Sequence, residues 1–144
     1  MITCKQPLAW SLWLTLPLLL PAAAVAQDVA QQPLPCSISS NCVNSASAGF
    51  APLVYAGEPA RGLALLKATL SHFPEASLVA SEPLQLTVIF RTPLGFRDEV
   101  TFLLEPAAQR IHFRSRSLLG LYDFGKNRSR MTAVVTRFQA EAAN

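Results

Sequence analysis

Residues that commonly form catalytic or metal sites are scarce in this sequence. Only 2 histidines and 3 cysteines occur among 144 residues, and charged residues make up 15%. No G-x-S-x-G motif marks a nucleophilic serine, and the cysteines with His72 and His112 match no zinc spacing. Asp98 and Glu99 are adjacent on a predicted strand, so their carboxylates point to opposite faces. The sequence therefore predicts no catalytic residue, no metal site and no cofactor, and it favours a non-enzymatic protein.

Long apolar runs are missing beyond the N-terminus. There, Lys5 precedes an uncharged run from Leu8 to Ala26 that ends in Ala-Val-Ala. A short positive segment, an apolar core and an A-x-A ending are typical of a secretory signal, so we expect residues 1–26 to be cleaved and the protein to be periplasmic or secreted. The alternative is an uncleaved membrane anchor, although prolines interrupt a run that is only about long enough to cross a bilayer. No later segment of the sequence is apolar for long enough to span a membrane.

A strong excess of one charge sign is also absent. Removal of 26 of the 144 residues leaves 118, the size of one domain, with 11 Lys or Arg against 9 Asp or Glu, a net charge of +2. So small a charge does not indicate a nucleic-acid-binding protein. The charges are unevenly placed, however, because six cations and a single acid, Asp123, lie between Arg110 and Arg130. This basic segment is the first place to look for a site.

The two cysteines that remain after cleavage, Cys36 and Cys42, predict a disulfide that closes the loop CSISSNC. An even pair in an exported chain favours this outcome. A metal site and a lipid-modified Cys36 are the alternatives. The metal site lacks further ligands at a suitable spacing, and the residues before Cys36 lack the small side chains usual in a lipidation signal.

The chain order predicts one α+β domain over residues 54–144, preceded by an arm. Residues 27–53 are rich in Pro, Ser, Ala and Gln without a hydrophobic period, which predicts an extended arm. A helix is expected between Pro59 and Pro74, and another from about Asn127. The four predicted strands are Ser77–Ser81, Leu84–Thr92, Glu99–Glu105 and Arg110–Ser117. This order favours a four-stranded antiparallel sheet with both helices on one face.

The hairpin between the last two strands allows a prediction of register. If Pro106–Gln109 is its loop, the numbers of facing residues sum to 215, and alternation assigns each pair to a face. On the open face the pairs are Glu105–Arg110, Leu103–His112, Thr101–Arg114 and Glu99–Arg116. Arg114 therefore faces no acid, and Asp98, opposite Ser117, points to the core face.

The segment "GLYDFGKN", Gly120–Asn127, departs by one residue from the phosphate-binding pattern G-x-x-x-x-G-K-[ST]. Nucleotide binding is disfavoured because Asn127 replaces the magnesium-binding hydroxyl and the sheet is expected to be antiparallel. A plainer interpretation is a turn in which Gly120 and Gly125 permit unusual backbone angles, Asp123 bonds the backbone, and Asn127 is the N-cap of the last helix.

Arg128 and Arg130 remain to be explained, since cations in a first helical turn oppose the helix dipole. In a structural interpretation they form an ion-pair cluster with Asp98 and Asp123 that attaches the last helix to the sheet. In a binding interpretation Arg114, Asn127, Arg128 and Arg130, with the amides of the turn, receive a carboxylate, phosphate or sulfate group. A hydrolase with Asp98 or Asp123 as base is a third hypothesis.

The segment "RSRSLLGLYDFGKNRSRM", from Arg114 to Met131, resembles the most characteristic stretch of the domain of unknown function 1499 family, R-S-x-S-R-x-G-x-x-D-x-G-x-N-R-x-R. "SSNCVNS" and "GFRDEVTF" resemble its S-P-N-C-V-S-S and F-x-D-D-V-E-F. The resemblance implies a small, often exported bacterial domain with no established activity. This chain departs from the pattern at Leu118, where the family has arginine, at Arg116, where it has a small residue, and at Ser40, where it has proline. An anion site built on the family arginine would therefore be altered here.

Together these observations predict an envelope or periplasmic module that recognises an anionic small molecule or envelope component through its arginine-rich strand, turn and helix. The alternative is a purely structural or protein-interaction domain in which the arginine and aspartate side chains only stabilise the fold. Neither hypothesis fixes the oligomeric state.

Overall fold

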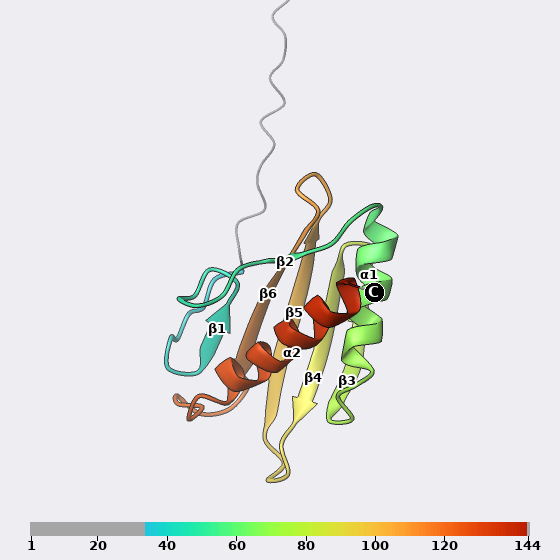
Figure 1. Cartoon of the computed structure of the whole chain (residues 1–144). Helices are drawn as coiled ribbons and strands as arrows, with labels where there is room; N and C mark the ends of the chain where they lie inside the picture. The colour runs from blue at the N-terminus through green and yellow to red at the C-terminus, as the bar shows by residue number, and fades with distance from the viewer. Residues whose placement is uncertain (1–33, 144) are drawn as a thin grey trace, which may run out of the picture.

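The computed structural model describes residues 34–143 (Figure 1). The predicted signal peptide and the first residues of the predicted arm lie outside this range. The elements, in chain order, are β1 (Cys42–Asn44), β2 (Leu53–Val54), α1 (Pro59–Leu70), β3 (Ala76–Ser81), β4 (Gln85–Arg91), β5 (Arg97–Glu105), β6 (Arg110–Ser117) and α2 (Lys126–Ala142).

The α+β class is confirmed, but the sheet has six antiparallel strands rather than the four expected. Its order is β1-β6-β5-β4-β3, and β2 also pairs with β6. The extra strands come from the segment predicted to be an extended arm: β1 covers Arg114–Arg116 of β6, and β2 covers its start at Arg110–Ile111. Because unpaired strand edges leave backbone groups without partners, these two short strands protect an edge that the four-stranded prediction left open.

The predicted register of the β5–β6 hairpin is confirmed over its whole length, from Asp98 opposite Ser117 to Glu105 opposite Arg110. Phe102 and Phe113 face each other and are fully buried. Among the charged pairs, Arg116 bonds Glu99 at 2.9 Å as predicted, whereas Glu105 contacts His112 at 3.0 Å instead of an arginine.

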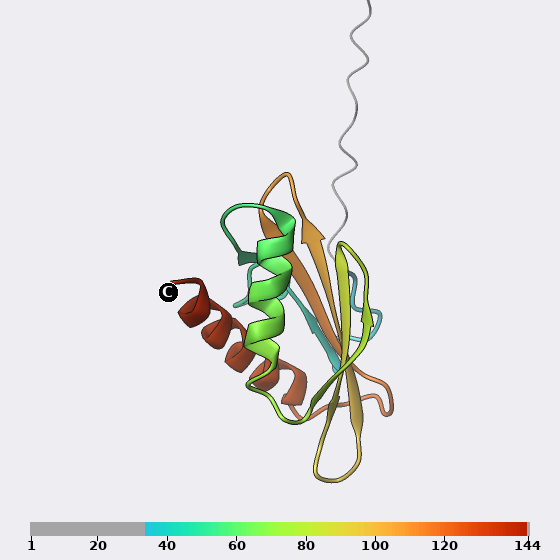
Figure 2. The ribbon, with the colours of Figure 1, turned by 90° about the vertical axis from the view of Figure 1, so that its right-hand side faces the viewer.

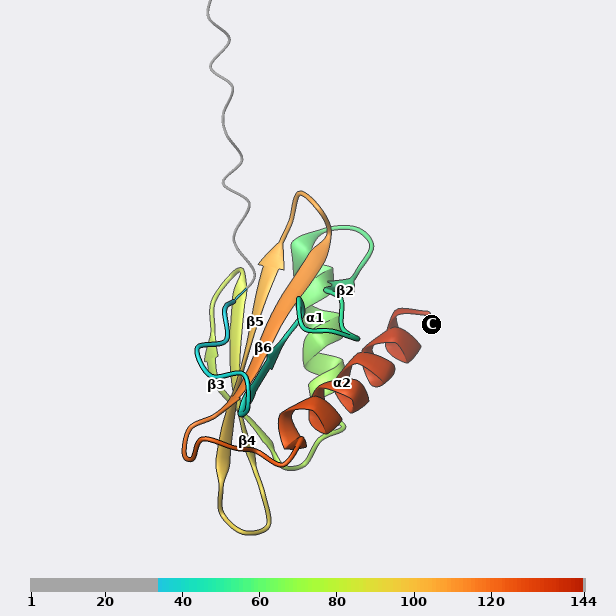
Figure 3. The same ribbon diagram turned by 90° about the vertical axis from the view of Figure 1, so that its left-hand side faces the viewer.

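Both helices cover the same face of the sheet, as predicted, and the core lies between them and the strands (Figures 2 and 3). The core side chains are large and apolar; among those fully buried are Leu66 of α1, Phe90 of β4, Phe102 of β5, Phe113 of β6, and Met131 and Phe138 of α2. Each comes from the apolar stripe of a helix or from alternate positions of a strand. The open face of the sheet carries the arginines of β6 and the disulfide-bonded Cys42.

The predicted disulfide between Cys36 and Cys42 is present, with a Cα–Cα distance of 5.7 Å. It closes a short loop directly before β1, which holds the start of the described chain against β6. Within residues 34–143, none of the helices combines the length and the apolar character that a membrane crossing requires.

Candidate functional site

The connection between β6 and α2 is a turn built on two glycines and one aspartate. Gly120 and Gly125 have φ angles of 85° and 76°, a left-handed region that favours glycine, as predicted. The Asp123 carboxylate accepts hydrogen bonds from the backbone N–H groups of Gly125 at 3.0 Å and Asn127 at 2.8 Å. Gly125 precedes the helix, so the prediction that Asn127 is the N-cap was wrong. Asp123, which precedes the helix, accepts the hydrogen bonds of the backbone N–H groups at the start of α2.

Four backbone amides of this turn have acceptors within the protein. Asp123 donates its N–H to the Ser40 carbonyl at 3.2 Å, Lys126 donates to the Asp123 carbonyl at 3.0 Å, and the N–H groups of Gly125 and Asn127 go to the Asp123 carboxylate. A phosphate-binding loop presents such amides to its ligand. The geometry therefore agrees with a closed turn, not with a phosphate loop, despite the match to that pattern.

Asn127 is fully buried and lies at the centre of a hydrogen-bond network. Its carbonyl oxygen accepts from the Ser115 hydroxyl at 2.6 Å and from Arg130 at 3.0 Å. Its amide nitrogen donates to the Asn41 carbonyl at 2.9 Å and to the Ser117 hydroxyl at 3.1 Å. Asn127 thereby joins the start of α2 to β6 and to the residue before β1, and its polar atoms are committed to those contacts.

Arg130 and Asp98 form the ion pair that the strand register predicted. The Arg130 Nη2 atom donates to Asp98 Oδ2 at 2.6 Å, and the two side chains are only 10% and 4% exposed. The guanidinium also lies over the ring of Phe90, 4.9 Å from its centre. This contact attaches α2 to β5 and β4.

Arg128 does not bond an aspartate, contrary to the prediction. It donates to the Ala48 carbonyl at 2.9 Å and lies over the Phe50 ring, 5.1 Å from its centre. Phe50 in turn packs edge-on against Phe113 of the core. Arg128 therefore holds the segment between β1 and β2 against α2.

Arg114 was expected to have no partner, and that expectation was wrong. On the open face of the sheet, its guanidinium lies 3.7 Å from Glu99 Oε1 and 3.4 Å from the Pro35 carbonyl. Its Nε atom is buried without a hydrogen-bond partner in the described part of the chain. Because Arg130 bonds β5 and Arg128 bonds the arm, the three arginines do not surround one point.

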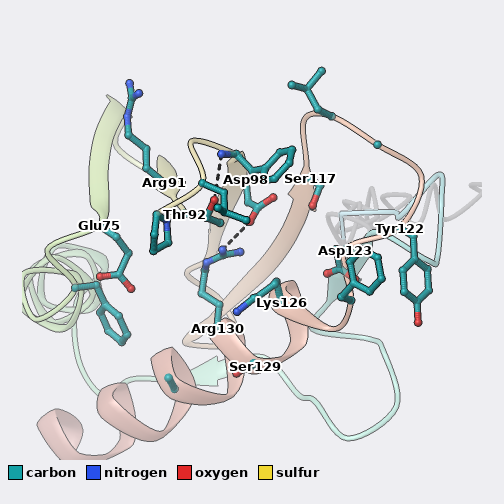
Figure 4. A pocket seen from close by; sticks show the side chains of 18 residues that line it. Glu75, Arg91, Thr92, Asp98, Ser117, Tyr122, Asp123, Lys126, Ser129 and Arg130 are labelled. Carbon is teal, nitrogen blue, oxygen red and sulfur yellow. Dashed lines mark hydrogen bonds and ion pairs between the residues drawn. The ribbon is translucent and has the colours of Figure 1, made fainter.

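A cleft of about 1040 Å³ opens where the β4–β5 hairpin, the turn after β6 and the first turns of α2 meet (Figure 4). Asp98 and Arg130 approach each other inside it. Much of the rest of its lining is apolar and comes from Phe73, Pro93, Leu94, Phe96, Leu119, Tyr122, Phe124 and Ala133. Ligand sites are commonly concave, mainly apolar and of roughly 300–1,000 Å³, so this cleft has the size and character of a binding site.

Lys126 brings an additional positive charge to the cleft. It lines the cleft together with Arg130, four residues further along α2, and residues at this spacing share one helix face. Arg130 is neutralised by Asp98, but no ion pair involves Lys126 in the range 34–143. The first turn of α2 contains no acidic residue. The Asp123 carboxylate already serves the amides at the start of the helix, so the charge that a bound anion would offset is that of Lys126.

In a comparison with protein-family models, residues 34–138 match the family described as "Protein of unknown function (DUF1499)". The matched range covers nearly all of the described chain and more than half of the full sequence. The chain belongs to the DUF1499 family. A search among curated proteins found no match. The family resemblance inferred from the motifs around Cys42, Asp98 and Asp123 is thus confirmed.

In this DUF1499 chain Leu118, which stands at a family arginine position, follows directly after β6. It is 39% exposed, and its N–H donates to the Arg97 carbonyl at 3.1 Å. The backbone pairing therefore continues one step past Asp98 and Ser117, and Arg97 is the neighbour across the strands. Arg97 keeps a cation beside this position, where a second arginine would add like-charge repulsion.

A serine, a histidine and a glutamate form a chain of contacts that the sequence did not suggest. The Ser45 hydroxyl lies 3.4 Å from His112 Nδ1, and His112 Nε2 lies 3.0 Å from Glu105 Oε2. The order resembles a catalytic triad, but Ser45 is 3% exposed. It lines neither the cleft described above nor a second cleft beside β2 and the end of α2. The contacts are those of a buried hydrogen-bond network that joins the end of β1 to β5 and β6.

The two aspartates considered as catalytic bases have other partners. Asp98 is paired with Arg130, and both carboxylate oxygens of Asp123 accept backbone N–H groups. A search of residues 34–143 for three or more metal-binding side chains in one place found no such group.

Proposed function

We propose that this DUF1499 protein is an exported, non-enzymatic module of the cell envelope that binds an amphipathic anion in the cleft at the start of α2. The anionic group of the ligand contacts Lys126 and Arg130, and its apolar part lies against Phe96, Tyr122 and Phe124. The observation that carries the proposal is the cleft itself, which combines a mainly apolar wall with Lys126, a cation that forms no ion pair within residues 34–143.

The charges in the cleft favour an anion over a cation or a neutral polar group. Three acids and three cations line the cleft, but the acids are not free to pair with Lys126. Asp98 pairs with Arg130, and Asp123 accepts two backbone N–H groups. Glu75 lies on the far side of the cleft from Tyr122 (Figure 4). A carboxylate, phosphate or sulfate that receives hydrogen bonds from Lys126 would be held by a charge-assisted interaction.

The apolar lining favours a ligand with a hydrocarbon part over a small inorganic anion. Phe96, Tyr122 and Phe124 are 53%, 62% and 85% exposed, and the last two also pack edge-on against each other. Burial of such surface stabilises a complex by about 25 cal/mol per Å² of apolar area. Inorganic phosphate would leave this surface in water.

Dodecyl phosphate, used below its critical micelle concentration, is a suitable probe, with inorganic phosphate and dodecanol as partial analogues. We expect dodecyl phosphate to raise the melting temperature of the secreted protein and the two analogues to raise it much less. Ser129→Trp fills the cleft from α2 and should abolish the shift. Thr136→Trp, also exposed on α2 but outside the cleft lining, should preserve it. Lys126→Gln should weaken binding about tenfold, since a charged hydrogen bond contributes roughly 1.5–3 kcal/mol.

An equal shift in the Ser129→Trp and wild-type proteins would contradict binding in the cleft. No shift with any alkyl phosphate, carboxylate or sulfate would favour the second candidate, a domain whose arginines serve only the fold. The contacts of Arg128 with Ala48 and Phe50, and of Arg130 with Asp98, support that candidate, because each joins two parts of the chain.

A further inference from the structure

Two loops lie at the same end of the molecule, the tip of the β4–β5 hairpin and the turn between β6 and α2 (Figure 1). Both loops carry exposed apolar side chains. We define the apolar tip as Leu94, Phe96, Leu119, Leu121, Tyr122 and Phe124. Three of these side chains extend almost fully into solvent: Leu94 is 84% exposed, Leu121 is 74% and Phe124 is 85%. Single exposed apolar residues are ordinary, but a contiguous group marks an interaction surface.

The two loops act as one surface because they frame the same cleft. Leu94 and Phe96 line it from the hairpin, and Leu119, Tyr122 and Phe124 line it from the turn. The hairpin tip is a tight turn in which Gly95 has a φ angle of 83°. The turn after β6 is held by the bonds of Asp123 described above. The apolar side chains are therefore presented on short, internally bonded loops.

Exposed cations flank, in the sequence, the two loops that carry the apolar tip. Arg91 and Arg97 lie at the two ends of the hairpin, and Lys126 follows the turn. The nearby acids are engaged, because Asp98 bonds Arg130 and Asp123 bonds two amides. Glu75 lines the cleft too, but on the far side from Tyr122 (Figure 4).

We infer that the apolar tip docks this protein on an anionic lipid surface, with Leu94, Leu121 and Phe124 among the acyl chains and the cations at the level of the headgroups. Apolar and aromatic side chains in front of Lys and Arg are the arrangement by which proteins attach to one leaflet of a membrane. Projecting loop ends fit the soft boundary of a bilayer better than the flat face of a protein partner. The inference extends the proposed function, because a protein docked in this way would hold its cleft at the source of anionic amphiphiles, but it rests on the apolar tip and not on the cleft.

Co-sedimentation with vesicles tests the inference directly. The secreted protein should bind vesicles of equal parts phosphatidylglycerol and phosphatidylcholine, and it should bind pure phosphatidylcholine much less. The double variant Leu94→Asp with Leu121→Asp should lose about tenfold or more of this binding, since apolar insertion and headgroup attraction are both reduced. A matched double variant, Val54→Asp with Val79→Asp, places the same charges on exposed apolar residues of β2 and β3 and should bind like the wild type. All three proteins are compared with the same N-terminus, so that any contribution of residues 1–33 cancels.

Two outcomes would overturn the inference. One is equal vesicle binding by the tip variant and the control variant. The other is a tip variant that converts a dimer into a monomer in vesicle-free light scattering, because the tip would then bind a second copy of the chain.

Leu121 does not line the cleft, which separates this inference from the proposed function. Leu121→Asp alone should weaken vesicle binding while the melting shift with dodecyl phosphate is kept. Ser129→Trp should lose the melting shift and keep vesicle binding. If the wild-type protein bound vesicles but showed no melting shift with dodecyl phosphate, the proposed function would fail. If it showed the melting shift but bound no vesicles, the membrane inference would fail.

Discussion

At the scale of single residues, Gly62 and Tyr55 show how the start of α1 is fixed. A Cβ atom placed on Gly62 would lie 2.8 Å from the ring of Tyr55, which is 3% exposed. Glycine inside a helix ordinarily weakens it relative to alanine. In the structure the missing side chain makes room for the tyrosine ring that packs on the first turn of α1.

Gly62→Ala should therefore destabilise the protein, although alanine is the better helix former. Overpacking of this kind costs about 1–3 kcal/mol, which exceeds the gain in helix propensity of about 1 kcal/mol. Chemical denaturation of the two proteins measures the difference. If the variant were more stable than the wild type, the contact between the ring and Gly62 would not be tight.

The hydroxyl of Tyr55 makes the stability of the protein depend on alkaline pH. Burial, and to a smaller extent the Glu58 carboxylate, raises the pKa of Tyr55 above its ordinary value of 10.0. As pH rises past about 10, the unfolded chain loses this proton first, so the free energy of unfolding falls. The hydroxyl is also buried without a hydrogen-bond partner among the described residues.

Tyr55→Phe should remove this part of the alkaline decline and leave the stability at neutral pH unchanged or higher by about 1 kcal/mol, because an unbonded buried hydroxyl is lost. Denaturation curves between pH 7 and pH 11 provide the measurement. A variant that lost stability at pH 7 would show that the hydroxyl has a partner, such as a bound water.

At the scale of elements, α2 is attached to the rest of the fold by two arginines with different surroundings. Arg130 bonds the buried Asp98 of β5, whereas Arg128 reaches a carbonyl and an aromatic ring in the arm. The loss of one partner of a buried ion pair leaves an unpaired charge in the core, but the loss of an exposed contact does not.

Arg130→Met should accordingly reduce the free energy of unfolding by about 3–5 kcal/mol. Arg128→Met is the matched control and should cost about 1 kcal/mol, the size of an exposed cation–π contact. In the double variant Asp98→Asn with Arg130→Met, part of the loss should return, because no charge is left unpaired. Equal losses in the two single variants would mean that Asp98 has access to water.

The residues that the sequence predicted well are those that a regular period places. Alternation along β5 and β6 fixed the register, and the register turned Asp98 toward Arg130. The partners of Arg114 and Arg128 could not be predicted in this way, because they include backbone carbonyls at Pro35 and Ala48 in an irregular segment. Any residue type can supply a backbone carbonyl, so the sequence contains no pattern that identifies these acceptors.

The same limit applies to two elements and to the cleft. β1 and β2 have only three and two residues, too few for a period to be recognised. Their partners in β6 lie between 56 residues (Val54 to Arg110) and 74 residues (Cys42 to Arg116) further along the chain. The cleft forms between a hairpin and a turn that are far apart in the sequence. The sequence does not predict that apolar residues such as Leu94 and Phe124 line a site, because the segments around them have the composition of turns.

At the scale of the whole molecule, most of the arginines and the exposed apolar side chains of the apolar tip lie in different regions. The arginines of β6 lie on the open face, and Arg128 and Arg130 bind α2 to its neighbours. The apolar tip lies at one end, beside Lys126, which forms no ion pair in the part of the chain that the structure describes. The basic segment that stood out in the sequence is thus mostly part of the scaffold, and the site that we propose lies next to it.

The pairing of β1 and β2 with β6 also has a consequence for when the protein can fold. The first strand of the domain pairs with a strand near the C-terminal end of the chain, since Cys42–Asn44 pairs with Arg114–Arg116. Contacts between distant parts of a chain slow folding, and they cannot form until the later part is available. A chain that is threaded through a membrane from its N-terminus would therefore remain open until β6 had crossed, which is the state that a translocation channel requires. The short disulfide loop, by contrast, spans six residues and can close as soon as Cys42 emerges.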